Sequence, residues 1–436
     1  MFTGGLRLFI AIGGALVALA LTACGDMPGQ TAPQGPTAAS LAAAAPTVYI
    51  GASVTEIALD AATTGGRVDF LLPGGPAETA GLREGDIVTT FGDKPAHSTD
   101  ALVAVLKGVT AGAAVPVALI RDGQPLTVDV HPESRPADYT VRFYQAMINR
   151  VQTEEQAAAN AEAKRAYRRA FDHDVNALRF IGIARAAVPN AAQRFDDDLA
   201  RVAALLPKLK PAPAISSEVE RHSDLAIAIM HQAHSDADND AASNEFSRAI
   251  YEAPWVADLY RDYGLVLTKA GNAGAGRTNL TRYLVLAPQA RDAAATRQRI
   301  AEIQPLADEQ KAWLPFLGSK SMENDEIDLL TLRDRKLLIT VATAAPDSGY
   351  KSGDTLCLGT ISGNQFRGRC AFKSAHAGFI GCFGGERDYD ADGGIDASGA
   401  LIVRSIKYVH YDPESCAVDT EDRGAFRTYA KPGRSL

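Results

Sequence analysis

The chain has 436 residues, of which 46% are hydrophobic and 22% are charged, and its formal net charge at pH 7 is -8. This length is more than one hydrophobic core normally serves, so about two to four domains are expected. Lysine and arginine form no cluster along the chain, which argues against nucleic acid as a partner.

The N-terminus predicts export and lipid attachment. Residues 8–21 are almost wholly apolar, and the stretch that ends them, Leu21-Thr22-Ala23-Cys24, resembles a bacterial lipobox. In that family the cysteine, here Cys24, is lipidated and becomes the first residue of the mature protein, so residues 1–24 would be the signal peptide. A plain signal peptide or a short membrane anchor is the alternative, but the apolar run is short for a bilayer span. Gly25, rather than aspartate, follows the cysteine, which favours the periplasmic face of the outer membrane.

Shifts in composition predict a multidomain α+β protein. Pro, Gly, Ala, Ser and Thr without an apolar period indicate a flexible tether directly after the lipobox. Further on, β-branched residues become rare where Ala, Arg, Glu and Gln dominate, and short alternating runs return near the C-terminus. The expected parts are the tether at 25–45, a β-rich domain at 46–133, a helical region at 134–215, helical repeats at 216–316 and a second β-rich domain at 317–436.

The first β-rich domain is expected to consist of short strands with helical insertions. Asp122-Gly123 between the last two strands is a strong hairpin signal, and Ser98 or Thr99 is placed to cap the helix. The predicted strands are 48–52, 67–72, 87–91, 115–121 and 124–130, and the predicted helix is 98–109.

Within this domain, residues 73–92 read PGGPAETAGLREGDIVTTFG. A single helical turn, a left-handed glycine, a tight turn and a strand follow one another at close spacing. This stretch resembles the central signature of bacterial PDZ domains, as found in periplasmic proteases. The resemblance implies a small β-rich domain with a groove that binds extended peptides.

In the PDZ family, backbone N–H groups of one loop hold the C-terminal carboxylate of a peptide, which adds to the sheet as an extra strand. The resemblance places that loop at 49–52, where Gly51 would let the backbone approach the ligand closely. Apolar residues of the helix would form the floor of the side-chain pocket, although they would serve equally well as ordinary core. The candidate peptide-binding residues are Tyr49, Ile50, Gly51, Ala52, Leu102 and Leu106.

The middle of the chain predicts helices at 139–170 and on to 209, then a break at 208–215. Beyond the break, Pro254 and Pro288 lie 34 residues apart, and each follows an alanine. This period resembles two tetratricopeptide repeats at about 223–289, followed by a capping helix at 292–303. Gly276 and Tyr283 depart from the family pattern, which prefers alanine at both positions. A helical bundle whose prolines merely end helices is the alternative. The resemblance implies a second protein partner at the concave face of the repeats.

The C-terminal part predicts an exported β-rich domain of no recognised family. Four cysteines in such a domain indicate two disulfides in preference to a metal site, and three pairings are possible. The cysteines are Cys357, Cys370, Cys382 and Cys416. The predicted strands are 326–332, 336–343, 356–361, 366–372 and 402–409, with a hairpin turn at Ser362-Gly363-Asn364.

Complete catalytic motifs are missing from the sequence. Neither G-x-S-x-G nor H-E-x-x-H occurs, and no cofactor is expected. Asp347-Ser348-Gly349 resembles the aspartate turn of retropepsin-like proteases, but Pro346 and Tyr350 depart from that pattern and favour a surface loop. A calcium loop is a weak candidate, because position twelve is Gly399 and the bidentate glutamate is therefore missing. Its oxygen ligands would come from Asp388, Asp390, Asp392 and Asp396.

These features favour a non-catalytic, lipid-anchored adaptor in the periplasm. It would hold extended C-termini in the PDZ groove and a second protein on the helical repeats. One alternative is an envelope peptidase or other hydrolase with its active site in the C-terminal domain. Another is a purely structural protein, in which the PDZ fold is kept but its groove is closed.

Overall fold

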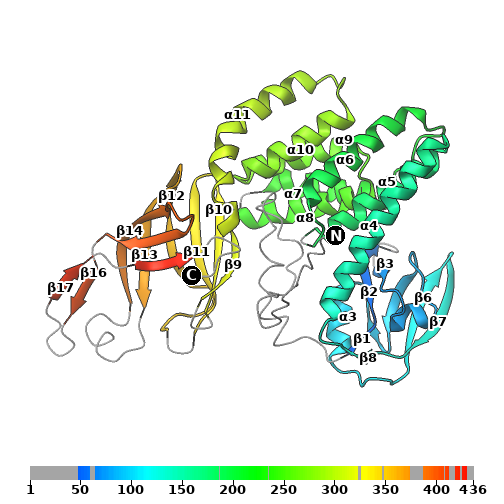
Figure 1. Cartoon of the computed structure of the whole chain (residues 1–436), viewed down its shortest axis with the longest axis horizontal. Helices are drawn as coiled ribbons and strands as arrows, with labels where there is room; N and C mark the ends of the chain where they lie inside the picture. The colour runs from blue at the N-terminus through cyan, green and yellow to red at the C-terminus, as the bar shows by residue number, and fades with distance from the viewer. Residues whose placement is uncertain are drawn as a thin grey trace, which may run out of the picture. The chain divides into compact units, whose positions relative to one another are not determined.

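A computed structural model describes most of the chain from residue 48 onward (Figure 1). The described residues are 48–58, 64–185, 187–233, 235–322, 326–345, 348–373, 386–406, 408–411, 418–422 and 425–429. Cys24 and the tether, on which the lipoprotein prediction rests, lie outside them. The chain forms two compact units: one holds the described residues up to 304 except for 271–274, and the other holds 271–274 and the residues from 305 onward.

The N-terminal domain is an antiparallel sheet with two short helices. The main strands follow the order β2-β3-β4-β6-β7, β5 pairs with β4, and β1 pairs separately with β8. The elements are β1 (Val48–Tyr49), β2 (Ala52–Ala58), β3 (Thr64–Leu71), α2 (Pro76–Thr79), β4 (Ile87–Phe91), β5 (Lys94–Pro95), α3 (Thr99–Leu106), β6 (Val115–Arg121), β7 (Gln124–Val130) and β8 (Glu133–Ser134).

Local signals account for much of this domain. Asp122 and Gly123 both have positive φ, 50° and 76°, so the turn between β6 and β7 is the tight hairpin that the sequence predicted. Helix α3 begins after Ser98, whose Oγ accepts a hydrogen bond from the Ala101 N–H at 3.1 Å. Strand β2 was not predicted. Its residues are mostly half-buried and give only a weak alternation.

The helical region follows directly. The helix or helix pair predicted at 139–170 is a pair of helices, which separate at Arg165 with φ 56°. The predicted capping helix continues past Pro305 to Lys311. The elements are α4 (Tyr139–Ala163), α5 (Tyr167–Ile183), α6 (Ala191–Leu205), η2 (Leu206–Lys208), α7 (Ser217–Gln232), α8 (Asp236–Glu252), α9 (Ala257–Lys269), α10 (Ala273–Leu286), α11 (Ala293–Lys311) and η3 (Leu314–Phe316).

Helices α7 to α10 fit the predicted pair of repeats. Helix α7 packs on α8, and α8 packs on α9. Ala242, Phe246 and Ala249 of α8 are fully buried, as expected of a helix packed between two others. Assignment to the tetratricopeptide family itself remains a prediction.

Gly276 lies where that pattern prefers alanine, and the structure shows why alanine is absent. A Cβ at Gly276 would lie 2.3 Å from Thr268 Oγ1 and 3.0 Å from the carbonyl oxygen of Gly264. We expect Gly276→Ala to lower the free energy of unfolding by about 1–3 kcal/mol, because α9 and α10 would have to separate.

Gly274→Ala is the matched control on the same helix. Its Cβ would meet no atom within 4 Å in the described part of the chain, so the free energy of unfolding should stay the same or rise slightly. Hydrogen exchange of α9 and α10, which reports the free energy of opening these helices, measures both variants. A Gly276→Ala protein as stable as the control would contradict the close approach of these helices.

The N-terminal domain packs against α4 and α5 in the same compact unit. Phe70 of β3 meets Phe143 and Phe180 with ring centroids 5.2 and 6.1 Å apart. The apolar cluster here includes Tyr49, Phe70, Leu72, Met147, Val151, Phe180 and Ile181. This face of the domain is therefore covered by helices.

The C-terminal unit is built on an antiparallel sheet of order β18-β15-β14-β13-β12-β11-β10-β9, while β16 and β17 pair separately. The strand predicted at 402–409 is interrupted and forms β15 and β16, and β14 was not predicted. The strands are β9 (Gly318–Ser321), β10 (Ile327–Arg333), β11 (Lys336–Thr343), β12 (Thr355–Ser362), β13 (Gln365–Lys373), β14 (Glu386–Ile395), β15 (Leu401–Ser405), β16 (Tyr408–Tyr411), β17 (Val418–Asp422) and β18 (Ala425–Tyr429).

One of the expected disulfides is present. Cys357 and Cys370 lie opposite each other on β12 and β13 and are bonded, and both are buried in the core of the sheet. Cys382 and Cys416 lie outside the described residues. In the described part of the chain, no helix has the length and apolar character needed to cross a membrane.

Candidate peptide-binding site

The loop between β1 and β2 has two backbone N–H groups that point away from residues 72–77. The carbonyl oxygen of Ile50 accepts a hydrogen bond from the Ala77 N–H at 2.9 Å, and that of Gly51 accepts one from the Leu72 N–H at 2.7 Å. In a planar trans peptide the N–H group points opposite to the carbonyl. The N–H groups of Gly51 and Ala52 are therefore directed outward, and such successive donors can hold an anion.

Glycine is required at the centre of this loop. Gly51 has φ +73°, and a Cβ there would lie 3.0 Å from Leu72 Cβ. A side chain at this position would be strained and would also push the loop away from Leu72. The predicted close approach of the Gly51 backbone to a peptide ligand stays a prediction.

The predicted pocket residues lie in the domain core, between the sheet and α3. Ile50, Leu102 and Leu106 are 4%, 3% and 5% exposed and belong to one apolar cluster with Val54. These three residues are thus core residues in this structure, as the alternative expected, and their part in a side-chain pocket stays a prediction.

Tyr49 points away from this pocket. Its ring packs on Tyr139 of α4, with centroids 4.9 Å apart, and its hydroxyl donates to Glu133 Oε2 at 3.1 Å. Burial and the neighbouring Glu133 carboxylate raise the pKa of Tyr49. Tyr49 thus supports the loop from behind, and its side chain is not available to a ligand.

A residue that the sequence placed only as a possible helix cap lies directly at the predicted groove. Thr99 Oγ1 accepts a hydrogen bond from the Val54 N–H at 3.1 Å and donates one to the Val54 carbonyl oxygen at 3.0 Å. Val54 lies in β2, an edge strand of the sheet. The sequence contained one local clue to this contact. Ser98 and Thr99 are adjacent hydroxyl residues, and because one residue is enough to cap the helix, the other hydroxyl can bond elsewhere.

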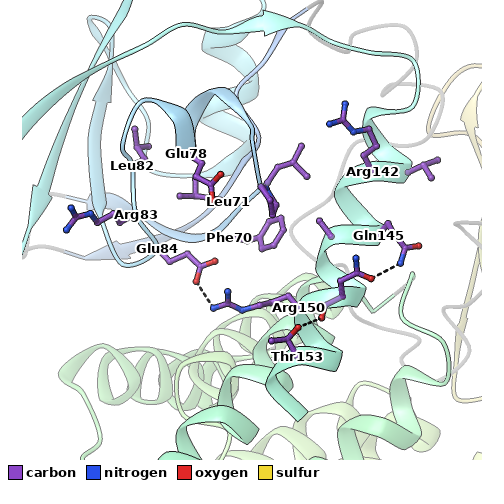
Figure 2. Close-up of a pocket in the computed structure, with 15 residues that line it drawn as sticks. Phe70, Leu71, Glu78, Leu82, Arg83, Glu84, Arg142, Gln145, Arg150 and Thr153 are labelled. Atoms are coloured by element: carbon purple, nitrogen blue, oxygen red, sulfur yellow. Dashed lines mark hydrogen bonds and ion pairs between the residues drawn. The ribbon is translucent and has the colours of Figure 1, made fainter. Parts of the chain in front are cut away.

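A concave region lies between the N-terminal domain and α4 (Figure 2). This cavity of about 890 Å³ has an apolar wall from the domain, which includes Phe70, Leu71 and Leu82. Polar side chains of α4 form the opposite wall, and Arg150 Nη2 contacts Glu84 Oε2 at 3.0 Å across it. No sequence pattern pointed to this cavity, because it depends on how the helix packs against the domain.

The calcium-loop candidate is not supported by the backbone. Asp388, Asp390 and Asp392 lie at alternate positions of β14, which pairs regularly with β13. An extended strand cannot wrap its oxygens around one ion as a coiled loop does. Asp396 instead closes a turn after the strand, where its Oδ1 accepts hydrogen bonds from Ser398 and Ala400.

The aspartate proposed for a peptidase site, Asp347, lies outside the described residues. The C-terminal sheet does bury two other carboxylates, Glu326 and Asp328, which are 1% and 0% exposed. Arg427 forms ion pairs with both, and Tyr429 donates to Asp328 Oδ2 at 2.8 Å. Through Arg427 and Tyr429, strand β18 is thus linked to Glu326 and to Asp328 of β10.

Comparison with known proteins supports the N-terminal assignment. A PDZ domain family model matches residues 48–131. A protein of Thermotoga maritima, described provisionally as a zinc metalloprotease, is 35% identical over 72 residues. The match spans 16% of this chain and only 14% of that protein.

Solved structures match over a similarly small share of the chain. The HtrA-type protease AlgW with a decapeptide matches 21% of this chain and 30% of that chain at 20% identity, with a TM-score of 0.19. The HtrA3 PDZ domain bound to a phage-derived ligand, FGRWV, matches 20% of this chain and 85% of that chain at 18% identity, with a TM-score of 0.18.

The outward N–H groups, the glycine at their centre and the edge strand beside them thus lie inside the matched segment. The chain contains a PDZ domain at residues 48–131, followed by a helical region and by a β-rich region that holds the Cys357–Cys370 disulfide.

Proposed function

We propose that this protein is a non-catalytic adaptor whose PDZ domain binds the extended C-termini of partner proteins. The observation that carries the proposal is the outward direction of the Gly51 and Ala52 N–H groups at the start of the edge strand β2. A peptide carboxylate would be held by these donors, and the peptide backbone would continue along β2 as an added strand. Micromolar affinity, about 8 kcal/mol of binding free energy, is typical of such a site.

The rest of the chain supports an adaptor by its organisation. A lipidated Cys24 and a flexible tether would hold the domains at the periplasmic face of the outer membrane, and the helices of α7 to α10 would offer a second protein a surface of its own. Two weak sites on one tethered chain raise the effective concentration of their partners without any new contact. The lipid anchor, the location and the second partner belong to the proposal and rest on the sequence.

The direct test is to pan a phage library of random C-terminal heptapeptides on the full chain. Enriched sequences are then synthesised as free acids and as C-terminal amides. We expect the free acids to bind and the amides to lose at least tenfold in affinity, because the amide removes the charge that the loop N–H groups receive. Equal affinity of acid and amide would contradict the proposed carboxylate site.

Ser53→Asp and Ser53→Asn form a matched pair for the protein side. Ser53 lies in β2 beside the loop, and the two variants have nearly the same shape but differ by one negative charge. The aspartate is expected to weaken free-acid binding roughly fivefold, about 1 kcal/mol, relative to the asparagine. Cleavage of the bound peptides, followed by mass spectrometry, would contradict the non-catalytic role and favour the peptidase alternative.

A further inference from the structure

The β2 edge of the PDZ domain is already hydrogen-bonded in this structure. A single hydroxyl, Thr99 Oγ1, satisfies both the N–H and the carbonyl oxygen of Val54, at 3.1 and 3.0 Å. These are the two bonds that one residue of a paired neighbouring strand would make. Val54 and Thr99 are 45 residues apart in the sequence, so this contact exists only in the folded domain.

The contact lies where an added strand would have to pair. Strand β2 is at the end of the order β2-β3-β4-β6-β7, so its other edge faces α3. Because Thr99 is the first residue of α3, its hydroxyl joins the helix directly to that edge. A peptide that adds to β2 needs the same N–H and carbonyl groups of Val54.

We propose that Thr99 closes the peptide groove in the unliganded protein and is displaced when a peptide adds to β2. The proposal rests on the proposed peptide binding and concerns its regulation. The Thr99–Val54 contact competes with the ligand, so it lowers the affinity for every C-terminus that pairs with β2. When a peptide binds, its backbone replaces the Thr99 hydroxyl as the hydrogen-bond partner of the Val54 N–H and carbonyl groups. The Thr99 hydroxyl then bonds to water instead.

The surroundings of Thr99 allow this exchange without unfolding the helix. Thr99 is an exposed residue, and both hydrogen bonds of its hydroxyl are only partly buried. The cap of α3 is a different residue, because Ser98 Oγ accepts the hydrogen bond from the Ala101 N–H. Leu102 and Leu106 keep α3 in the core when Thr99 turns away.

Hydrogen–deuterium exchange of the unliganded full chain tests the closure without any peptide. Thr99→Val replaces the hydroxyl by a methyl group of the same size, and Thr99→Ser keeps the hydroxyl. We expect the Val54 amide, followed in peptic fragments that cover β2, to exchange at least tenfold faster in Thr99→Val than in the wild type and in Thr99→Ser. Equal exchange in all three proteins would overturn the closure, whatever the domain binds.

Capture of the random C-terminal heptapeptide phage library then tests the competition. Thr99→Val is expected to bind its free-acid peptides with about tenfold higher affinity than the wild type. Loss of one or two competing hydrogen bonds corresponds to about this change in affinity. Thr99→Ser should match the wild type. Faster exchange with unchanged affinity would overturn the competition and leave peptide binding intact. Failure of all three proteins to retain any phage would instead overturn the proposed peptide binding.

Discussion

Replacing Arg427 with methionine is expected to lower the opening free energy of the C-terminal sheet by about 3–5 kcal/mol at pH 7. Arg427 forms ion pairs with Glu326 and Asp328, and its guanidinium also lies over the Tyr350 ring, 5.7 Å from the centroid. Methionine keeps much of the apolar volume but removes the cation, and two carboxylates that are almost inaccessible to water would then face each other. The large loss reflects the desolvation of these unpaired charges.

This loss should depend on pH. Burial raises the pKa of Asp328, and Arg427 works in the opposite direction. Without the cation the pKa of Asp328 rises further above its value in the unfolded chain, so the folded state binds the proton more tightly. The destabilisation of Arg427→Met should therefore shrink as the pH falls from 7 toward 4.

The measurement is hydrogen exchange of β10 and β18, because a chain of several domains has no single unfolding transition. Arg369→Met is the control in the same sheet. Arg369 is 67% exposed and lies 3.7 and 3.9 Å from the Asp388 and Asp390 carboxylates, so its loss should change stability by less than about 0.5 kcal/mol. Similar effects of the two substitutions would show that the buried cluster does not stabilise the sheet.

The second large effect is expected where the PDZ domain joins the helices. Arg67 of β3 forms two 2.7 Å hydrogen bonds with the Glu252 carboxylate of α8, and its Nε donates to Asp69 Oδ1 at 2.9 Å. The side chains of Asp69 and Glu252 are 4% and 10% exposed. Burial raises the pKa of Asp69 in spite of the neighbouring arginine. Arg67→Met would leave both carboxylates poorly solvated and unpaired, at an expected cost of about 3 kcal/mol.

The measurement is hydrogen–deuterium exchange. In Arg67→Met, the amides of β3 and of the end of α8 should exchange faster than in the wild type, which would report the loss of stability. Adding Glu252→Met to Arg67→Met should recover part of it, because one unpaired carboxylate is removed. Arg299→Met serves as the control, since Arg299 and Glu302 form an exposed pair on one helix. If Arg67→Met behaved like Arg299→Met, packing of the apolar cluster around Phe70 would be enough to hold the domain.

Elements with strong local signals were predictable. The predicted bounds of β4, β6, β7 and β11 agree with the structure, because turn residues bound these strands and because β6 and β11 bury alternate side chains. The same holds for the cap of α3 at Ser98 and for the hairpin at Gly363. Propensity, capping and turn geometry act over a few residues, and a single sequence records them directly.

Other elements had local patterns that fit two structures. The aspartates of β14 alternate, which suits the ligands of a calcium loop and also one face of a strand. Pairing with β13 determines the outcome. Strand β2 has weak alternation because it is half-buried at the edge of a sheet, and its pairing with β3 makes it a strand.

The sequence by itself determined the domain order, the PDZ signature at 73–92 and the position of the loop around Gly51, because these depend on neighbours in the chain. Only the tertiary structure decided that Thr99 meets Val54, that Arg67 meets Glu252 and that Arg427 meets Asp328. These partners are 45, 185 and 99 residues apart. The free energy of such a contact depends on burial and on which groups the fold brings together, and no local pattern of residues records either.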